Sequence, residues 1–218
     1  MHIKIFNKEK EFIAAALKQI SSLNDSEKTA QIGLSGGTTP ENLYKEIAKK
    51  IPLKNAKIFQ VDERYIPKEN PDSNYRLIKD TILSNNKNQP KSFHYFDTSL
   101  PKNKALAKYE KELPNEPLDL IILGIGPDGH TASLSPNSPA LISKKKAEHT
   151  TTKDFTIKDR LTITFPIILQ AKKLLILLKG KEKQELLNKL ITSKISEKEF
   201  PAKKLLKHQN LEILLLAK

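Results

Sequence analysis

Hydrophobic and polar residues alternate along the chain in two spacings, one typical of β-strands and the other of α-helices. Short apolar runs predict strands at residues 2–6, 30–34, 57–61, 118–123, 160–165, 173–178 and 211–217. Apolar residues three or four positions apart predict helices at residues 8–23, 40–50, 73–83 and 181–191. Strands that alternate with helices predict an α/β fold: a doubly wound, mostly parallel sheet with helices on both faces. We expect one domain that spans residues 1–218.

The composition is that of a globular protein, with 38% hydrophobic and 29% charged residues. No apolar run approaches the roughly 18 residues of a membrane span, and residues 1–10 lack a signal-peptide core. We therefore expect a cytoplasmic protein without a membrane partner. The absence of cysteine excludes disulfides and cysteine nucleophiles, and no spaced set of histidines indicates a metal, so we expect no cofactor. Nothing in the sequence demands more than a monomer.

The formal net charge of +13 raises the alternative of a nucleic-acid-binding protein. The excess consists almost entirely of lysines scattered along the whole chain, and arginine occurs only at positions 64, 76 and 160. No segment combines arginines with aromatic residues, as proteins that bind single strands usually do. We therefore expect a solvated lysine surface, no nucleic-acid partner and a bias toward small anionic substrates.

Glycines mark the expected binding edge of the sheet. All seven lie at or just after the end of a predicted strand: Gly33, Gly36, Gly37, Gly124, Gly126, Gly129 and Gly180. Ligands of doubly wound sheets bind beyond the carboxyl ends of the strands, and glycine lets the backbone approach a ligand closely. The alternative that these glycines only form strand-to-helix turns stays open, although their clustering weakens it.

The first glycine cluster, Ser35-Gly36-Gly37-Thr38, joins a predicted strand to a predicted helix. Its backbone N–H groups lie near a helix N-terminus and predict a cradle for a phosphate or a carboxylate. The segment also reads Gly-x-Ser-x-Gly around Ser35, which is the nucleophile-elbow pattern of α/β-hydrolases. We consider the elbow the weaker alternative, because the segment follows only the second predicted strand and no HGGG segment precedes it.

Three charged residues, Asp62-Glu63-Arg64, follow the predicted strand at residues 57–61. Consecutive charges are uncommon inside a core, so this segment is either a solvated turn or part of a site. Arginine is suited to forked contacts with phosphate, which makes Arg64 a candidate phosphate ligand.

The last glycine-rich segment, residues 124–133, follows the most apolar predicted strand and contains His130. Histidine titrates near neutral pH, as a general base must, and Asp128 lies two positions before it. This setting predicts a catalytic role for His130. The other histidines, at positions 2, 94, 149 and 208, have no such setting.

These segments together resemble those of the 6-phosphogluconolactonase family. The resemblance rests on SGGTTP at residues 35–40, DERYIP at 62–67, SNY at 73–75 and LGIGPDGHTASL at 123–134. It continues in RLTIT at 160–164, GKEK at 180–183 and FPAKKL at 200–205, and so covers almost the whole chain. The resemblance implies an enzyme that hydrolyses 6-phosphoglucono-δ-lactone to 6-phosphogluconate in the oxidative pentose phosphate pathway.

The resemblance also implies roles for polar residues in these segments. His130 is expected to be the general base that activates water, with Asp128 or Asp62 orienting the histidine or the water. Backbone amides of the glycine turns are expected to stabilise the oxyanion. The residues expected to bind the substrate and its phosphate are Ser35, Gly36, Gly37, Thr38, Arg64, Gly126, Gly129, Arg160 and Lys183.

Two alternatives to the lactonase stay open. Glucosamine-6-phosphate deaminases and isomerases share the expected fold and a similar histidine segment, but Ser135 occupies the position of the deaminase glutamate. The other alternative is a non-catalytic sugar-phosphate-binding protein. The chain also departs from the lactonase pattern: Ser135 replaces the usual Phe, Asp159 replaces a small residue, and Lys218 ends the chain without the usual closing aspartate.

Overall fold

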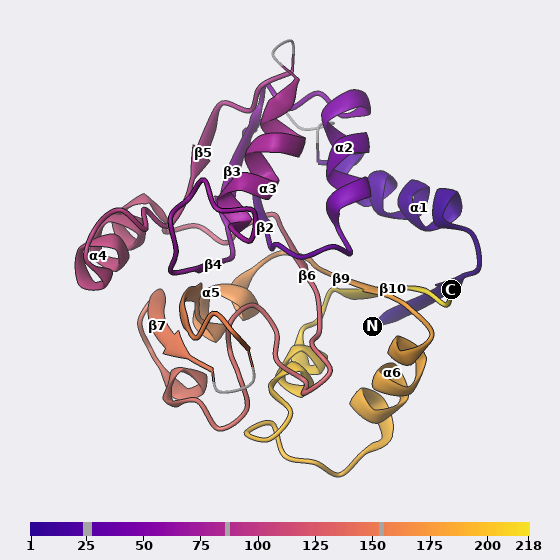
Figure 1. Cartoon of the computed structure of the whole chain (residues 1–218). Coiled ribbons are helices and arrows are strands. Elements are labelled where there is room, and N and C mark those ends of the chain that lie inside the picture. The colour runs from indigo at the N-terminus through magenta and orange to yellow at the C-terminus, as the bar shows by residue number, and fades with distance from the viewer. Residues whose placement is uncertain (24–27, 86–87, 153–154) are drawn as a thin grey trace.

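The computed structural model describes residues 1–23, 28–85, 88–152 and 155–218. Seven parallel strands form its central sheet, in the order β1-β10-β9-β6-β2-β3-β5 (Figure 1). They are β1 (His2–Phe6), β2 (Ala30–Leu34), β3 (Ala56–Gln60), β5 (Ser92–His94), β6 (Leu120–Leu123), β9 (Leu174–Lys179) and β10 (Leu211–Leu216). The predicted parallel sheet is confirmed, and the short edge strand β5 is an addition that the hydrophobic pattern does not predict.

Helices cover both faces of this sheet, which confirms the doubly wound fold. One face carries α1 (Glu9–Ser21), α2 (Glu41–Lys50) and α3 (Asn74–Thr81), each within three residues of a predicted helix. The other face carries α4 (Lys102–Glu112), α5 (Phe165–Gln170) and α6 (Glu182–Thr192), of which the pattern predicts only α6. Short 3₁₀ helices lie at Ile82–Ser84 (η1), Pro139–Ile142 (η2) and Pro201–Lys207 (η3).

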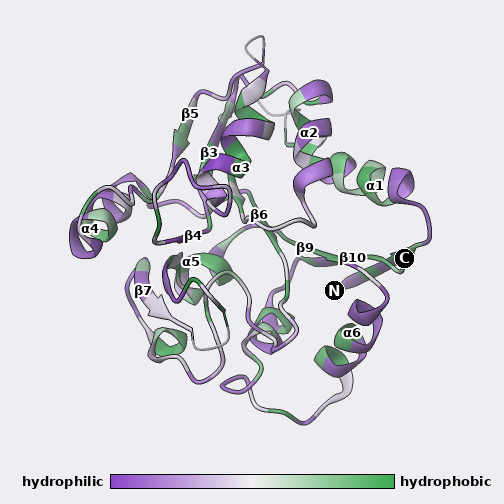
Figure 2. Ribbon diagram, viewed as in Figure 1, coloured by the Kyte–Doolittle hydropathy of each residue, from purple (hydrophilic) through white to green (hydrophobic). Residues whose placement is uncertain are grey.

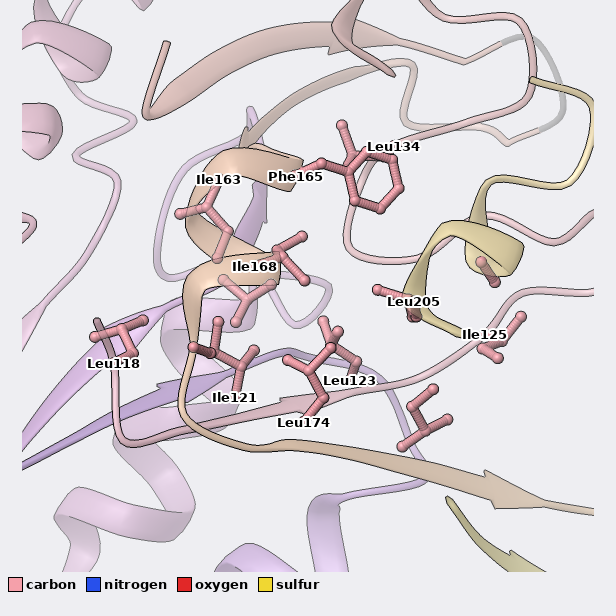
Figure 3. Close-up of a cluster of buried hydrophobic side chains, with 14 of the residues drawn as sticks. Leu118, Ile121, Leu123, Ile125, Leu134, Ile163, Phe165, Ile168, Leu174 and Leu205 are labelled. Atoms are coloured by element: carbon pink, nitrogen blue, oxygen red, sulfur yellow. The ribbon is translucent and has the colours of Figure 1, made fainter. Parts of the chain in front are cut away.

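Strand β6 illustrates why the sheet is covered on both faces. Leu120 and Ile122 pack into the hydrophobic cluster under α1, α2 and α3. Ile121 and Leu123 point the other way, into the cluster that includes Ile168 of α5 (Figure 3). Figure 2 shows the same hydrophobic character along β9 and β10. A continuous apolar run therefore indicates a strand that is buried on both sides.

A second, three-stranded sheet packs beside the first and is antiparallel. It consists of β4 (Asp62–Arg64), β8 (Asp159–Ile163) and β7 (Ala147–Thr151), in the order β4-β8-β7. The predicted strand at residues 160–165 is confirmed by β8, which belongs to this antiparallel sheet and not to the parallel one, since it pairs with β4 and β7. The alternative of a solvated turn at residues 62–64 is wrong.

The order in which strands are added to the sheet reverses between β2 and β6. From β2 the chain proceeds to β3 and β5 on one side, whereas from β6 it proceeds to β9 and β10 on the other. Because β2 and β6 are neighbours, the loops that follow them diverge and leave a crevice at their carboxyl ends. Among the helices of the described residues, none combines the length and hydrophobicity that crossing a lipid bilayer requires.

Candidate active site

A pocket of about 360 Å³ lies at the carboxyl ends of β2 and β6. Its walls come from the loop after β2, the strands β4 and β8, the start of α3 and the loop after β6. Nine of the expected site residues line it: Ser35, Gly36, Gly37, Thr38, Asp62, Arg64, Gly126, His130 and Arg160. The crevice expected from the strand order thus collects most of the polar residues that the sequence singles out.

His130 and Asp128 form a close pair in the loop after β6. The ring nitrogen Nδ1 of His130 lies 2.5 Å from Oδ1 of Asp128, and the His130 side chain is 21% exposed. Burial opposes ionisation of Asp128, but its contacts with His130 outweigh burial and hold the pKa of this carboxyl below its ordinary value. An ionised carboxylate only accepts hydrogen bonds, so Nδ1 of His130 donates and the neutral ring carries no proton on Nε2.

Gly126 makes room for the His130 ring. A side chain at this position would place its Cβ 2.0 Å from Cε1 of His130, which is well inside van der Waals contact. The backbone N–H of Gly126 donates to the His130 carbonyl at 2.9 Å, so the loop closes on itself around the ring. Glycine at position 126 therefore fixes the place of the imidazole.

The loop after β2 presents free backbone donors to the pocket. Among the described residues, no acceptor meets the backbone N–H groups of Gly36, Gly37 and Thr38, which precede the N-terminus of α2. Such groups at a helix N-terminus attract anions. Ser35 has a different role, because its hydroxyl donates to the Ile122 carbonyl at 2.7 Å and ties β2 to β6. This bond argues against the nucleophile-elbow alternative.

Two arginines face each other across β4 and β8. Arg64 and Arg160 are directly opposite in the antiparallel register, an arrangement that destabilises a sheet unless an opposite charge compensates it. Burial lowers the pKa of Arg160; the charge of Asp62 opposes this shift, and the charge of Arg64 adds to it. Nε of Arg160 is buried without a hydrogen-bond partner among the described residues. The pair is suited to an anionic ligand.

Asp62 does not contact His130, so Asp128 is the carboxylate that orients the histidine in this structure. Asp62 is only 6% exposed, and its side chain binds two residues that the sequence did not assign to the site. Ser133 Oγ donates to Oδ2 at 2.6 Å, and Asn74 Nδ2 lies 3.3 Å from Oδ1. The only sequence signal for either residue is its place in the SNY and HTAS segments.

The alternation along β4 explains its three consecutive charges. Asp62 and Arg64 point to the pocket, whereas Glu63 points to the opposite side and is 1% exposed. Glu63 accepts the backbone N–H groups of Asn74 and Tyr75 at 2.8 and 2.7 Å, which caps the N-terminus of α3. Burial raises the pKa of Glu63, and these hydrogen bonds oppose that shift.

Two expected binding residues do not line the pocket. Gly129 lies beneath the ring of Phe200, and its N–H donates to the Gly126 carbonyl at 3.0 Å. Lys183, at the start of α6, donates from Nζ to the Ile125 carbonyl at 2.9 Å, behind the histidine loop. Gly129 thus closes a turn within the loop, and Lys183 supports the loop from outside. The described residues contain no group of three or more His, Asp or Glu side chains placed to share a metal ion.

A second pocket, of about 720 Å³, is lined by residues of the segments 135–143 and 148–152. Two of its polar side chains are paired within the protein: Ser143 donates to Glu148 at 2.8 Å, and His149 pairs with Asp159 at 2.6 Å. No residue of its lining has a buried side-chain polar atom without a partner, as far as the chain is described. The paired arginines of the smaller pocket are not among the residues that line this larger one.

Known proteins resemble the chain over almost its full length. The family described as glucosamine-6-phosphate isomerases/6-phosphogluconolactonase matches residues 7–214. A probable 6-phosphogluconolactonase of Dictyostelium discoideum is 34% identical over 87% of this chain and 85% of the relative. The crystal structure of a 6-phosphogluconolactonase from Thermotoga maritima covers 98% of both chains with a TM-score of 0.87 and 28% identity. A monomeric glucosamine-6-phosphate deaminase shares the fold, with a TM-score of 0.84, 23% identity and coverage of 99% of this chain and 97% of its own.

Proposed function

Because the chain belongs to the glucosamine-6-phosphate isomerase/6-phosphogluconolactonase family, we propose that it hydrolyses 6-phosphoglucono-δ-lactone to 6-phosphogluconate in the pocket that contains His130. The observation that carries the proposal is the His130–Asp128 pair, which opens into the same pocket as two opposed arginines. In the proposed reaction, the pair supplies a base for water and the arginines supply a site for a phosphate. These two features suit a substrate that carries both a lactone ester and a phosphate group.

His130 is the general base of the reaction. Asp128 holds the proton on Nδ1, so Nε2 accepts a proton from water as the water oxygen attacks the lactone carbonyl carbon. When the bond between that carbon and the ring oxygen breaks, the imidazolium returns the proton to the departing oxygen. The product is an open-chain acid, and the enzyme regains its starting protonation state.

The positive end of the pocket binds the phosphate. Arg160 supplies a forked donor, and Arg64, which donates from Nη1 to the Asp72 carbonyl, supplies its remaining N–H groups. The free N–H groups of Gly36, Gly37 and Thr38 supply backbone donors near the N-terminus of α2. A backbone N–H of the glycine turns that the phosphate does not use is suited to the developing oxyanion. Such a donor typically contributes about 3–4 kcal/mol to the transition state.

Ser135 favours the lactonase over the deaminase. It stands where the deaminases have their glutamate, and it lines the larger pocket rather than the pocket of His130. We also propose that the enzyme is a cytoplasmic monomer that uses no cofactor and binds no nucleic acid.

Two assays on the purified protein test the proposed function. Freshly generated 6-phosphoglucono-δ-lactone is expected to disappear well above its spontaneous rate, while glucosamine 6-phosphate releases no ammonia. Ammonia release without lactone hydrolysis would favour the deaminase. Binding of 6-phosphogluconate without either activity would favour the non-catalytic sugar-phosphate-binding protein.

A further inference from the structure

Asn74 places an unused hydrogen-bond acceptor in the wall of the pocket. Its Nδ2 faces two acceptors, the Asp62 carbonyl at 2.8 Å and Asp62 Oδ1 at 3.3 Å. An amide nitrogen donates and an amide oxygen accepts, so this surrounding fixes the orientation of the amide group. Oδ1 of Asn74 therefore points the other way, toward Gly36, where an added Cβ would come within 1.8 Å of it.

That oxygen has no donor within the protein. Asn74 is 2% exposed, and its Oδ1 is one of the buried side-chain atoms that lack a partner among the described residues. A buried acceptor without a donor costs free energy, typically about 1–3 kcal/mol. Because Asn74 lines the pocket, a bound ligand can supply the missing donor.

Asp62 adds a second acceptor beside the first, and Ser133 holds it in place. Each carboxylate oxygen of Asp62 has one donor, Ser133 or Asn74, and each therefore keeps an unused lone pair. Ser133 is itself fixed, because its N–H donates to Thr162 Oγ1 at 3.3 Å and its carbonyl accepts from Thr150 at 2.9 Å. The acceptor pair of Asn74 and Asp62 is thus rigid.

A phosphate oxygen has no proton to offer these acceptors, and the charge of Asp62 repels it. A group that donates hydrogen bonds is required, and the lactone of the proposed function carries hydroxyl groups as its only donors. We propose that Asn74 Oδ1 and the Asp62 carboxylate together receive one ring hydroxyl of the substrate, with Ser133 as the positioning residue of Asp62. This inference rests on the proposed function and assigns the polarity of the pocket: arginines for the phosphate, acceptors for a hydroxyl.

The test combines variants with substrates that lack one hydroxyl. Wild type, Asn74→Ala and Ser133→Ala are assayed on 6-phosphoglucono-δ-lactone and on its 2-, 3- and 4-deoxy analogues. On the full substrate, Asn74→Ala is expected to lower kcat/KM by about tenfold to a hundredfold, as for loss of one buried hydrogen-bond partner. On one of the three analogues, Asn74→Ala and Ser133→Ala are expected to cause almost no further loss, because the hydroxyl they serve is already absent.

Asn88→Ala is the matched control. Asn88 also holds backbone groups, including the N–H of Leu53 at 2.7 Å, but it lies outside the pocket. It is expected to lower Tm and leave the preference among the four substrates unchanged. Equal losses on all four substrates in Asn74→Ala and in Ser133→Ala would overturn the inference, while lactone hydrolysis by wild type would still support the proposed function. Ser133→Ala removes a single oxygen atom and carries the test alone if Asn74→Ala does not fold.

Discussion

The pocket of about 360 Å³ that contains His130 and the pocket of about 720 Å³ lined by the segments 135–143 and 148–152 differ in how their polar atoms are used. In the larger pocket, the side chains of Ser143 and His149 are paired within the protein. In the smaller pocket, Asn74 Oδ1 and Arg160 Nε are buried without partners among the described residues, and Asp128 Oδ2 behind His130 is in the same state.

This difference indicates which of the two pockets is a ligand-binding site. Buried polar groups in folded proteins are almost always paired, so unpaired groups that gather in one place indicate that a ligand completes them. Volume alone would favour the larger pocket. The unused donors and acceptors, the opposed arginines and the His130–Asp128 pair all favour the smaller one.

Asp128→Asn removes the carboxylate that orients His130 in the smaller pocket, and it is expected to have the largest effect on activity. The carboxylate is ionised above its lowered pKa and loses its charge only as the pH falls through that value, so at neutral pH it holds Nδ1–H of His130. An amide can donate to Nδ1 instead and so favours the wrong tautomer. We expect kcat to fall by roughly 10²- to 10⁴-fold. Steady-state kinetics at neutral pH check this, and an unchanged kcat would mean that Asp128 does not orient the base.

Gly126→Ala alters the smaller pocket without removing any functional group. The new methyl group would lie about 2.0 Å from the His130 ring and must displace it. A misplacement of about 1 Å at a reacting group can cost about 10²-fold in rate, and we expect a loss of that order in kcat with a small change in KM. A crystal structure of the variant would show the shifted ring. Full activity with an unmoved ring would contradict this account of the loop.

Arg160→Ala separates binding from chemistry in the smaller pocket. Loss of a charged donor to the phosphate is expected to raise KM by roughly tenfold to a hundredfold and to change kcat much less. Arg76→Ala is the matched control, since Arg76 pairs with Asp80 at 3.3 Å on the outside of α3 and does not line the pocket. Equal KM values for the two variants would show that Arg160 does not bind the phosphate.

Ser135→Phe tests the larger pocket with a bulky side chain. Ser135 lines that pocket, and Phe is the usual residue of lactonases at this position. We expect kcat/KM to stay within about twofold of wild type, as is typical of substitutions away from a site. A loss of tenfold or more in the lactonase assay would show that the larger pocket contributes to the reaction.

The sequence predicts the strands that contain an apolar run and misses the short or polar strands β4, β5 and β7. The run at residues 118–123 reads as a strand because both faces of β6 are apolar. Asp62-Glu63-Arg64 reads equally well as a turn, because its strand character comes from pairing with residues 160–162. The chain at residues 102–112 forms a helix that is mostly exposed, with Ala105 and Tyr109 as its buried residues, so its apolar pattern is weak.

In the candidate active site, too, contacts between neighbouring residues could be predicted from the sequence and contacts between distant residues could not. His130 and Asp128 are two positions apart, and their pairing follows from local sequence. Asp62 and Ser133 are 71 positions apart, and their contact depends on how β4 and β8 pair beside the histidine loop. Sequence reasoning therefore found Asp62 as a site residue but left open whether it orients His130, and the structure places it against Ser133 and Asn74.

The most direct test of the account is the rate of hydrolysis of freshly generated 6-phosphoglucono-δ-lactone, above its spontaneous rate, for wild type, His130→Ala and His149→Ala. His149 is the matched control, because it lines the larger pocket and Lys102 still holds its partner Asp159 at 2.5 Å when the ring is removed. The account predicts fast turnover by wild type and His149→Ala, and a loss of about 10²- to 10⁴-fold in kcat for His130→Ala. Near-normal turnover by His130→Ala would contradict the proposed base and the choice of the smaller pocket as the active site.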